Sequence, residues 1–203
     1  MNAFVTFILG IVFPKLIFKI KTDKKVVYLT FDDGPTPEVT LQVLSILKEF
    51  NAKATFFCLG KNVEQNQDLF NQILEDGHSV GNHTQNHLKG IDTSLDVYFD
   101  DIKNAQNHLN TKLFRPPYGR ISLKQIKFIS KYYKIVMWNV LSKDYDKKMF
   151  PEKCLHRVIT RTKAGSIVVF HDSLKAQMNV LNVLPRYLFW LRENNFECKA
   201  IED

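Results

Sequence analysis

After about residue 25 the chain alternates between short apolar runs and longer segments in which apolar residues recur at helical spacing. Residues 25–31 form the first apolar run, which is typical of a buried strand. Thr36, Pro37 and Glu38 follow it and are typical of the start of a helix. The same two patterns predict strands at 25–31, 54–59, 78–81, 113–115, 135–140, 166–170 and 196–201, and helices at 36–50, 63–75, 95–109, 123–132, 151–161 and 179–193.

Apolar strands separated by amphipathic helices predict an α/β fold in which helices cover a mostly parallel sheet. Two architectures accommodate about seven such units in one domain, a doubly wound sheet and a (β/α) barrel. In both, functional groups gather at the carboxyl ends of the strands. The polar residues that follow each predicted strand are therefore the first candidates for a functional site.

Residues 1–22 stand outside this pattern, and we interpret them as a hydrophobic N-terminal segment that precedes one domain at 23–203. The chain is apolar from residue 3 to residue 13, and this run is too short to span a bilayer by itself. It also lacks the basic start and the cleavage site of an ordinary signal peptide. A membrane anchor, an atypical export signal and a segment packed on the domain remain open. We favour the first two, which predict membrane association through residues 1–18 and a location at the cell envelope rather than in the cytoplasm.

Composition narrows the class of protein. Apolar residues make up 45% and charged residues 24% of the 203 residues, as in an ordinary globular domain with a full core. The net charge is +7, but the lysines are scattered and no segment interleaves arginine with aromatic residues, so we expect no nucleic-acid partner. Cys58, Cys154 and Cys198 are too widely spaced for a disulfide framework or a cysteine metal site. We expect a monomer.

Two acids, Asp32 and Asp33, follow the first predicted strand directly. Adjacent carboxylates at a strand end repel each other and usually need a cation. The alternative is a solvated turn, because Asp, Gly34 and Pro35 are common turn residues.

Two histidines, His83 and His87, follow the third predicted strand. If this piece is helical, their spacing places both imidazoles on one face, where they can share a metal ion. The spacing matches that of the zinc-protease helix, but Thr84 stands where that motif has its glutamate, so a general base must come from elsewhere. Two unrelated surface histidines are the alternative.

Three further clusters follow later strands. Pro116 and Pro117 make a rigid loop after Arg115, which can hold a backbone N–H in the direction that an oxyanion needs, or can simply end the strand. His171 ends a buried strand, where it can donate or accept a proton or have only a structural role. The weakest cluster is Asp144 with Tyr145.

Taken in order, these clusters resemble the five motifs of the polysaccharide deacetylases, which are also called carbohydrate esterase family 4 or the NodB-homology domain. The matching residues run from about residue 25 to the end of the chain: Thr30, Phe31, Asp32, Asp33 and Gly34; His83, Thr84 and His87; Arg115, Pro116, Pro117, Tyr118 and Gly119; Asp144 and Tyr145; Val169, His171 and Asp172. The resemblance implies a distorted, incomplete (β/α) barrel. It also implies one divalent metal ion, usually Zn²⁺ with Co²⁺ or another divalent ion as alternatives, held by Asp33, His83 and His87.

The resemblance further implies a catalytic role for each remaining residue. Asp32 would be the general base that activates the metal-bound water, and Arg115 would hold and tune it. His171 would be the general acid for the leaving amine, tuned by Asp144. The metal ion and the Tyr118 backbone N–H would stabilise the oxyanion. The slot for the acetyl methyl group would be lined by Tyr145 and Val169.

Two positions depart from the family pattern: Leu141 stands where a further acid is usual, and Tyr145 where Trp is commoner. Both concern the acetyl pocket or its wall, so they bear on substrate preference rather than on the chemistry. The sequence thus predicts a metal-dependent hydrolase that removes N-acetyl groups from amino-sugar polymers or oligomers, such as chitin-like oligomers or peptidoglycan. Alternatives are an O-deacetylase of a polysaccharide such as xylan, a non-catalytic sugar-binding relative and, from another class, a non-haem iron oxygenase.

Overall fold

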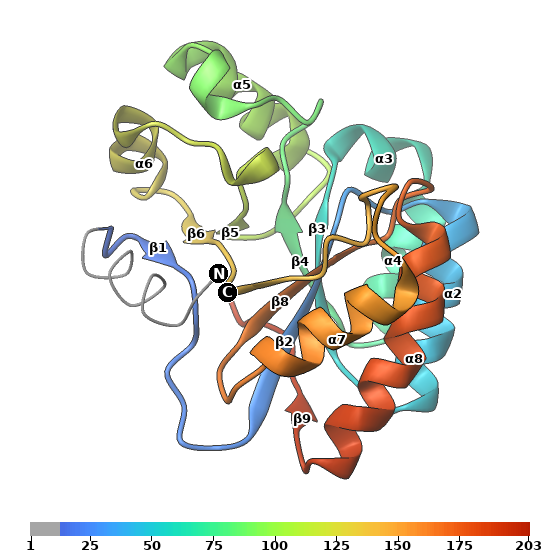
Figure 1. Ribbon diagram of the computed structural model, residues 1–203. Coiled ribbons are helices and arrows are strands. Elements are labelled where there is room, and N and C mark those ends of the chain that lie inside the picture. The colour runs from blue at the N-terminus through green and yellow to red at the C-terminus, as the bar shows by residue number, and fades with distance from the viewer. Residues whose placement is uncertain (1–12) are drawn as a thin grey trace.

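The computed structural model describes residues 13–203, which form one α/β unit (Figure 1). Its strands are β1 (Leu16–Ile17), β2 (Val26–Asp32), β3 (Ala54–Cys58), β4 (Ser79–Asn82), β5 (Leu113–Phe114), β6 (Lys134–Val136), β7 (Val140–Leu141), β8 (Ile167–His171) and β9 (Glu197–Cys198). Its helices are α2 (Pro37–Glu49), α3 (Gly60–Gln65), α4 (Gln67–Glu75), α5 (Leu95–Gln106), α6 (Leu123–Ile129), α7 (Pro151–Arg161) and α8 (Gln177–Glu193), with 3₁₀ turns η1 (Gly90–Asp92) and η2 (Pro117–Gly119).

The strands pair in the order β1-β6-β5-β4-β3-β2-β8-β7, with β9 beside the start of β2, and every strand pairing is parallel. Strands β6 and β7 lie near opposite ends of this order, yet only residues 137–139 separate them along the chain. The sheet must therefore curl until its two ends approach each other. The result is the distorted, incomplete (β/α) barrel that the sequence predicted.

Residues 13–203 contain nine strands rather than about seven, for two reasons. The run 135–140, predicted as one strand, changes partner part of the way along: Ile135 pairs with Phe114 of β5, and Val140 pairs with Val168 of β8. Strand β1, which was not predicted, is only two residues long and pairs with β6. The run 196–201 contains only the two-residue strand β9.

Helix boundaries differ from the prediction mainly at 63–75, where one helix was expected. Helices α3 and α4 meet there at Asn66, whose φ of −135° and ψ of 52° are not helical. Helix α5 ends at Gln106 rather than at residue 109. These corrections change the length of elements but not their order.

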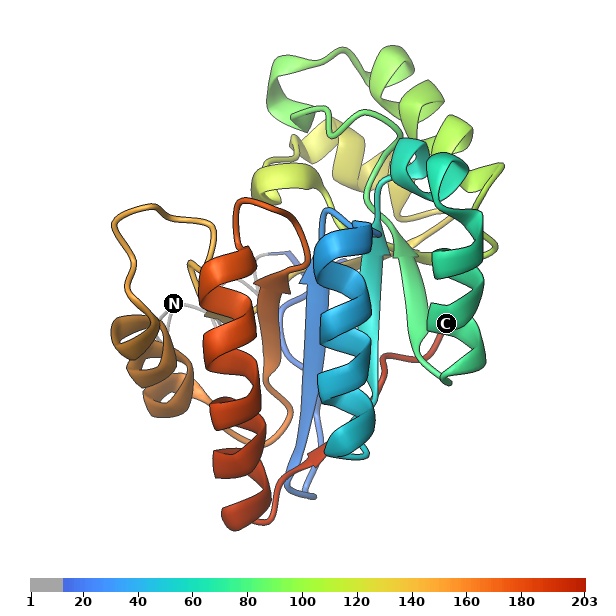
Figure 2. The same cartoon turned by 90° about the vertical axis from the view of Figure 1, so that its right-hand side faces the viewer.

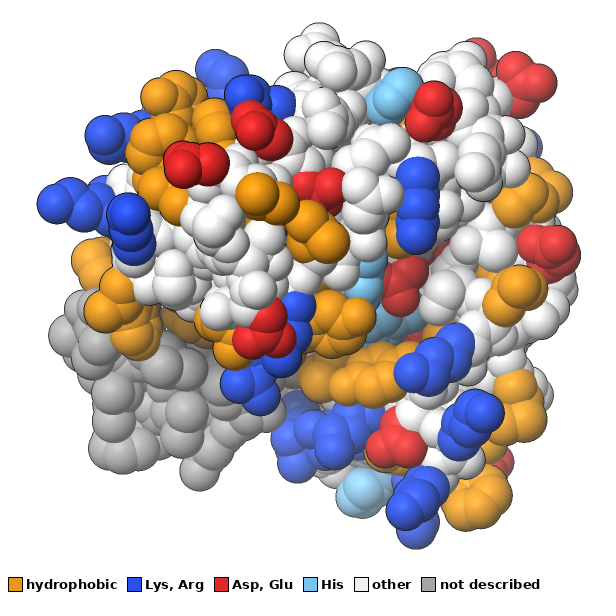
Figure 3. Space-filling view, turned by 90° about the horizontal axis from the view of Figure 1, so that it is seen from above, with side chains coloured by type: hydrophobic (Ala, Val, Ile, Leu, Met, Phe, Trp, Pro, Cys, Tyr) orange, Lys and Arg blue, Asp and Glu red, His pale blue; other side chains and the backbone are white. Residues whose placement is uncertain are grey.

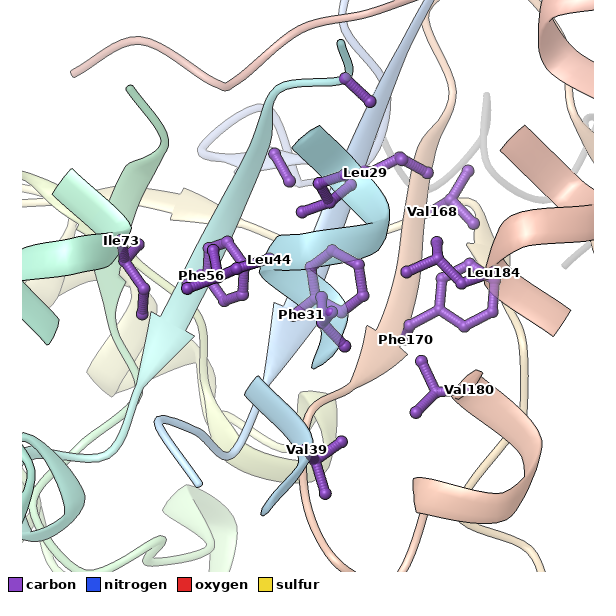
Figure 4. Packing of buried hydrophobic residues seen from close by; sticks show 14 of the residues in the cluster. Leu29, Phe31, Val39, Leu44, Phe56, Ile73, Val168, Phe170, Val180 and Leu184 are labelled. Atoms are coloured by element: carbon purple, nitrogen blue, oxygen red, sulfur yellow. The ribbon is translucent and has the colours of Figure 1, made fainter. Parts of the chain in front are cut away.

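The main core lies between the sheet and the outer helices. Leu29 and Phe31 of β2 point to this side together with Phe170 of β8, and Figure 4 shows them packed against side chains of α2 and α8. The rings of Phe31 and Phe56 stack at 5.0 Å between centroids. Burial of each such ring stabilises the fold by about 1.5–3 kcal/mol. Figure 2 shows α8 and α2 side by side, covering β8, β2 and β3.

Part of the hydrophobic N-terminal segment packs on this domain. Leu16 and Phe18 are buried beside Ile135 and Met137, so residues 16–18 are a piece of the fold. The anchor and signal interpretations concern mainly residues 1–12, which lie outside the described residues. Within residues 13–203 no helix combines the length and the apolar character needed to cross a membrane.

Candidate active site and metal centre

The polar residues singled out in the sequence meet at the carboxyl ends of the parallel strands. Asp32 is the last residue of β2 and pairs in register with His171, the last residue of β8. His83 follows β4 and Arg115 follows β5. Seen from above in Figure 3, histidine and acidic side chains lie at the bottom of a hollow on this face.

Asp33, His83 and His87 form a candidate metal centre. One possible ligand atom from each residue lies within 4.8 Å of the others. Oδ1 of Asp33 is 3.7 Å from Nε2 of His83 and 3.2 Å from Nε2 of His87. Two imidazoles and one carboxylate suit Zn²⁺ and leave coordination positions open for water and substrate.

Hydrogen bonds on the far sides of the two rings favour this arrangement. Nδ1 of His83 lies 2.8 Å from the carbonyl oxygen of Arg115, so the proton belongs on Nδ1 and the lone pair of Nε2 faces Asp33. Nδ1 of His87 lies 3.1 Å from the hydroxyl of Tyr118. Burial lowers the pKa of His83 to about 4, with neighbouring charges contributing less, so this ring is neutral and able to bind a metal at neutral pH.

The carboxylate of Asp33 is ionised in this setting. Burial alone would raise its pKa, but the hydrogen bond from His87 and the charge of His171 hold it well below its usual value. Its backbone has a φ of 82°, a left-handed conformation that turns the chain out of β2. The donor set therefore fits a divalent cation in its geometry, and Asp33 and His83 have the protonation states that metal ligands need.

The two histidines do not lie on a helix, although their spacing was interpreted on the assumption that they did. Thr84 and His87 have φ values of 70° and 61°, so residues 83–87 form a tight loop that brings the rings to 5.1 Å between centroids. Asp101 of α5 holds this loop, because its Oδ2 accepts hydrogen bonds from the backbone N–H groups of Gln85 and Asn86, each at 3.0 Å.

Asp32 lies beside the metal centre and is paired with a fully buried arginine. Nη1 of Arg115 donates to Oδ1 of Asp32 at 2.6 Å and to the hydroxyl of Thr30 at 2.7 Å. Nε and Nη2 donate to the carbonyl oxygens of Val136 and Met137, where the chain passes from β6 to β7. The guanidinium thus fixes Asp32 and also satisfies carbonyl groups at the interruption of the sheet.

His171 and Asp144 form a second pair across from Asp32. Oδ1 of Asp144 is 2.7 Å from Nδ1 of His171. Oδ2 of Asp144 accepts a hydrogen bond from the backbone N–H of His171, also at 2.7 Å. Burial would lower the pKa of His171, but the charge and hydrogen bond of Asp144, with smaller contributions from Asp33 and Asp32, raise it to about 9. The ring is therefore protonated at neutral pH, as a general acid must be.

The three residues assigned to substrate binding occupy different places. Tyr118 has a φ of 59° in η2, and its side chain is exposed apart from the contact with His87. Its backbone N–H has no hydrogen-bond acceptor within residues 13–203. The ring of Tyr145 packs edge-on against that of His171, at 4.8 Å between centroids. Val169 has no exposed surface and lies two residues before His171 on β8.

Sequence reasoning missed two positioning residues besides Asp101. Asn62 of α3 donates from Nδ2 to the carbonyl oxygen of Asp33 at 2.7 Å. Asp172 appeared only as part of a motif, yet its carboxylate accepts from the Gly34 backbone N–H at 3.1 Å and from the Thr40 hydroxyl at 2.6 Å. Burial raises the pKa of Asp172 to about 7 against the effect of these bonds. No local signal reveals these positioning roles, because each side chain acts on a segment distant in sequence.

These features define a class of protein, the α/β-barrel hydrolases. The class combines a curled parallel sheet with a centre of two histidines and one aspartate, and beside that centre lie a buried carboxylate and a protonated histidine. The family model of the polysaccharide deacetylases matches residues 19–135, and the chain belongs to this family. It is therefore a hydrolase that acts on carbon–nitrogen bonds other than peptide bonds, as the sequence predicted.

Two relatives cover most of the chain. A peptidoglycan-N-acetylglucosamine deacetylase of Bacillus cereus is 31% identical over 193 residues, which are 92% of this chain and 91% of that protein. A chitooligosaccharide deacetylase of Azorhizobium caulinodans is 32% identical over 162 residues, which are 76% of this chain and 77% of that protein.

Solved structures show the same fold. The crystal structure of a peptidoglycan N-acetylglucosamine deacetylase in complex with 4-naphthalen-1-yl-N-oxidanyl-benzamide superposes with a TM-score of 0.89 at 29% identity, covering 95% of this chain and 94% of that chain. A carbohydrate esterase family 4 pseudoenzyme from Bacillus anthracis superposes with a TM-score of 0.81 at 27% identity, covering 92% of this chain and 67% of that chain. The fold alone therefore does not guarantee activity, which depends on the residues of the site.

Proposed function

We propose that this protein removes the acetyl group from N-acetylglucosamine units of a glycan, with peptidoglycan as the leading substrate and chitin-like oligomers as the second. The observation that carries the proposal is the candidate metal centre of Asp33, His83 and His87, placed next to Asp32 on one strand and His171 on the neighbouring strand. The names of the relatives from Bacillus cereus and Azorhizobium caulinodans support the two substrate classes.

In this proposal Asp33, His83 and His87 would hold a divalent cation, with Zn²⁺ as the best fit to the donor set. When bound there, the ion would lower the pKa of a coordinated water towards ~7 and polarise the amide carbonyl of the substrate. The surroundings support the role, because the carbonyl of Arg115 and the hydroxyl of Tyr118 orient the two imidazoles from behind.

The residues around this centre would divide the proton transfers. Asp32, fixed by Arg115, takes the proton from the attacking water as general base. His171, protonated and held by Asp144, gives its proton to the amide nitrogen as the carbon–nitrogen bond breaks. Water oxygen thus ends in acetate, and the sugar leaves as a free amine. The backbone N–H of Tyr118, which has no acceptor within residues 13–203, is available to the developing oxyanion.

A role in glycan modification implies that the protein meets its substrate at the cell envelope, and we propose this location. The relatives named for peptidoglycan support it, and the apolar residues near the N-terminus are compatible with it.

The test is acetate release by the zinc-loaded protein from N-acetylglucosamine oligomers and from peptidoglycan glycan strands. Asp32→Asn is the matched inactive variant, because it keeps the shape of the side chain and the metal ligands. Release by the wild type but not by Asp32→Asn supports the proposal. Acetylated xylan is assayed in parallel, and release from it but from neither of the other two substrates would favour the O-deacetylase alternative. Sugar binding without release, with zinc bound, would favour a pseudoenzyme.

A further inference from the structure

A groove of about 390 Å³ leads from the metal centre across the carboxyl-terminal face, and it is lined on both sides by lysine. Asp33 and His87 form its inner end. Lys61, in the first turn of α3, lines one wall, and Lys175, in the loop between β8 and α8, lines the other. Lysine and arginine side chains border the hollow of the active site in Figure 3.

Both lysines are exposed and lack partners of opposite charge. Within residues 13–203, neither has a carboxylate at ion-pair distance; the lysines that have one are Lys89, Lys103 and Lys199. Among the described residues that line the groove, Asp33 is the only acid, and it already faces two histidines. The groove thus presents two uncompensated positive charges to the part of the glycan that extends from the reacting sugar.

Each lysine lies close to a residue of the candidate active site. Lys61 is followed by Asn62, whose side chain donates to the carbonyl oxygen of Asp33 at 2.7 Å. The ammonium group of Lys175 lies 5.6 Å from the centre of the Tyr145 ring, which packs against His171. Each cation therefore belongs to a wall that also carries a residue of the active site.

We propose that Lys61 and Lys175 form an anion-binding subsite that recognises a carboxylate on the glycan next to the N-acetylglucosamine unit being deacetylated. The inference rests on the proposed function and deepens it, since it makes an acidic glycan the preferred substrate over a neutral one. In peptidoglycan the carboxylate has two chemical sources: the lactyl group of N-acetylmuramic acid where it carries no peptide, and, where the lactyl group is amide-bonded to a peptide stem, the carboxylates of that stem. Both offer the same group to the lysines.

The test compares kcat/KM on three substrates: fully acetylated chitotetraose, a tetrasaccharide of alternating N-acetylglucosamine and N-acetylmuramic acid with free lactyl groups, and the same tetrasaccharide carrying peptide stems. The test variant is Lys61→Gln with Lys175→Gln. The control is Lys48→Gln with Lys163→Gln, which removes one exposed charge in the last turn of α2 and one in the loop after α7. Both variants have the same net charge, so a general charge effect cancels.

We expect the ratio of kcat/KM for acidic over neutral substrate to fall about three- to tenfold in the test variant, through KM, as for two exposed ion pairs. The fall should shrink with added salt, and the control should keep the wild-type ratio. If the ratio falls for the stem-free tetrasaccharide, the lysines recognise the lactyl carboxylate. If it falls only for the stem-bearing tetrasaccharide, they recognise a carboxylate of the peptide. An equal ratio in both variants overturns the subsite but leaves the proposed function standing. No acetate from any of the three substrates overturns both.

Discussion

The carboxylate of Asp144 holds His171 from two directions, through its ring and through its backbone. Oδ1 lies 2.7 Å from Nδ1, and Oδ2 accepts from the backbone N–H at 2.7 Å. Asp144 is itself held by the hydroxyl of Ser142 at 2.8 Å. The pair fixes the orientation of the imidazole, and the full negative charge of a buried carboxylate favours the imidazolium form.

The pH dependence of kcat/KM should report this pair. Because the general acid must be protonated, activity should be lost as pH rises through the pKa of His171, which is raised to about 9 by Asp144. A cation at the metal centre will move this limb towards lower pH. In Asp144→Asn the burial of the ring remains but the charge is gone, so the limb should move at least one further unit towards acid.

The control for this profile is Asp146→Asn, which removes an acid close in sequence that does not contact His171. Its basic limb should coincide with that of the wild type. If Asp144→Asn lowers activity at every pH without moving the limb, another group is the acid.

Exchanging Arg115 for lysine should destabilise the fold despite keeping the charge. A lysine cannot reproduce the planar set of donors that reaches Asp32, Val136 and Met137 together. Breaking a buried ion pair of this kind costs about 3–5 kcal/mol of unfolding free energy. Chemical denaturation of Arg115→Lys against the wild type measures it. Arg161→Lys, at the exposed end of α7, should change stability by less than about 0.5 kcal/mol.

Removal of metal should leave a folded but less stable protein. A ligand that binds only the native state adds about 2.7 kcal/mol of stability at a hundred times its Kd. We therefore expect zinc to raise the midpoint of thermal unfolding of the chelator-treated wild type. The increase should be lost in His87→Gln and retained in His156→Gln, whose histidine is exposed on α7. An equal increase in both variants would place the zinc elsewhere.

The parts of the fold that the sequence predicted are those with strong local patterns. The run through Leu29 and Phe31 and the helix that begins at Pro37 were placed to within a residue or two, because periodicity and capping are local properties. The interruption at residues 137–139 could not be predicted. Both halves of this run are apolar, and only the curling of the sheet decides that one half pairs with β5 and the other with β8.

The same contrast applies to the site. The spacing of His83 and His87 led to a metal centre, although through an assumed helix, whereas the actual geometry depends on two residues with left-handed backbone. The residues that hold this loop in place were not predicted, because their partners lie far along the chain. A buried acid on an otherwise ordinary amphipathic helix, such as Asp101, carries no signal in the sequence.

Asp101 joins helix α5 to the loop that carries both histidines. Its Oδ2 accepts from the N–H groups of Gln85 and Asn86, and its Oδ1 accepts from the side chain of Asn86 at 2.7 Å. The carboxylate is buried, with 6% of the residue exposed. Loss of this carboxylate would leave the backbone N–H of Asn86 without its acceptor, and that of Gln85 with only the carbonyl oxygen of Asp101 at 3.2 Å. The conformation of this loop is already strained at Thr84 and His87.

Asp101→Ala should therefore weaken zinc binding about 10- to 100-fold, the usual effect of removing a group that orients metal ligands. Because the ligands themselves remain, kcat/KM should recover at saturating zinc, which a direct ligand variant such as His83→Ala would not do. Titration of zinc affinity with activity measured at each point separates the two cases. The matched control is Asp100→Asn, the neighbouring exposed acid that pairs with Lys103, and it should bind zinc like the wild type. Unchanged zinc affinity in Asp101→Ala would mean that the left-handed residues alone fix the loop, and that Asp101 contributes to stability only.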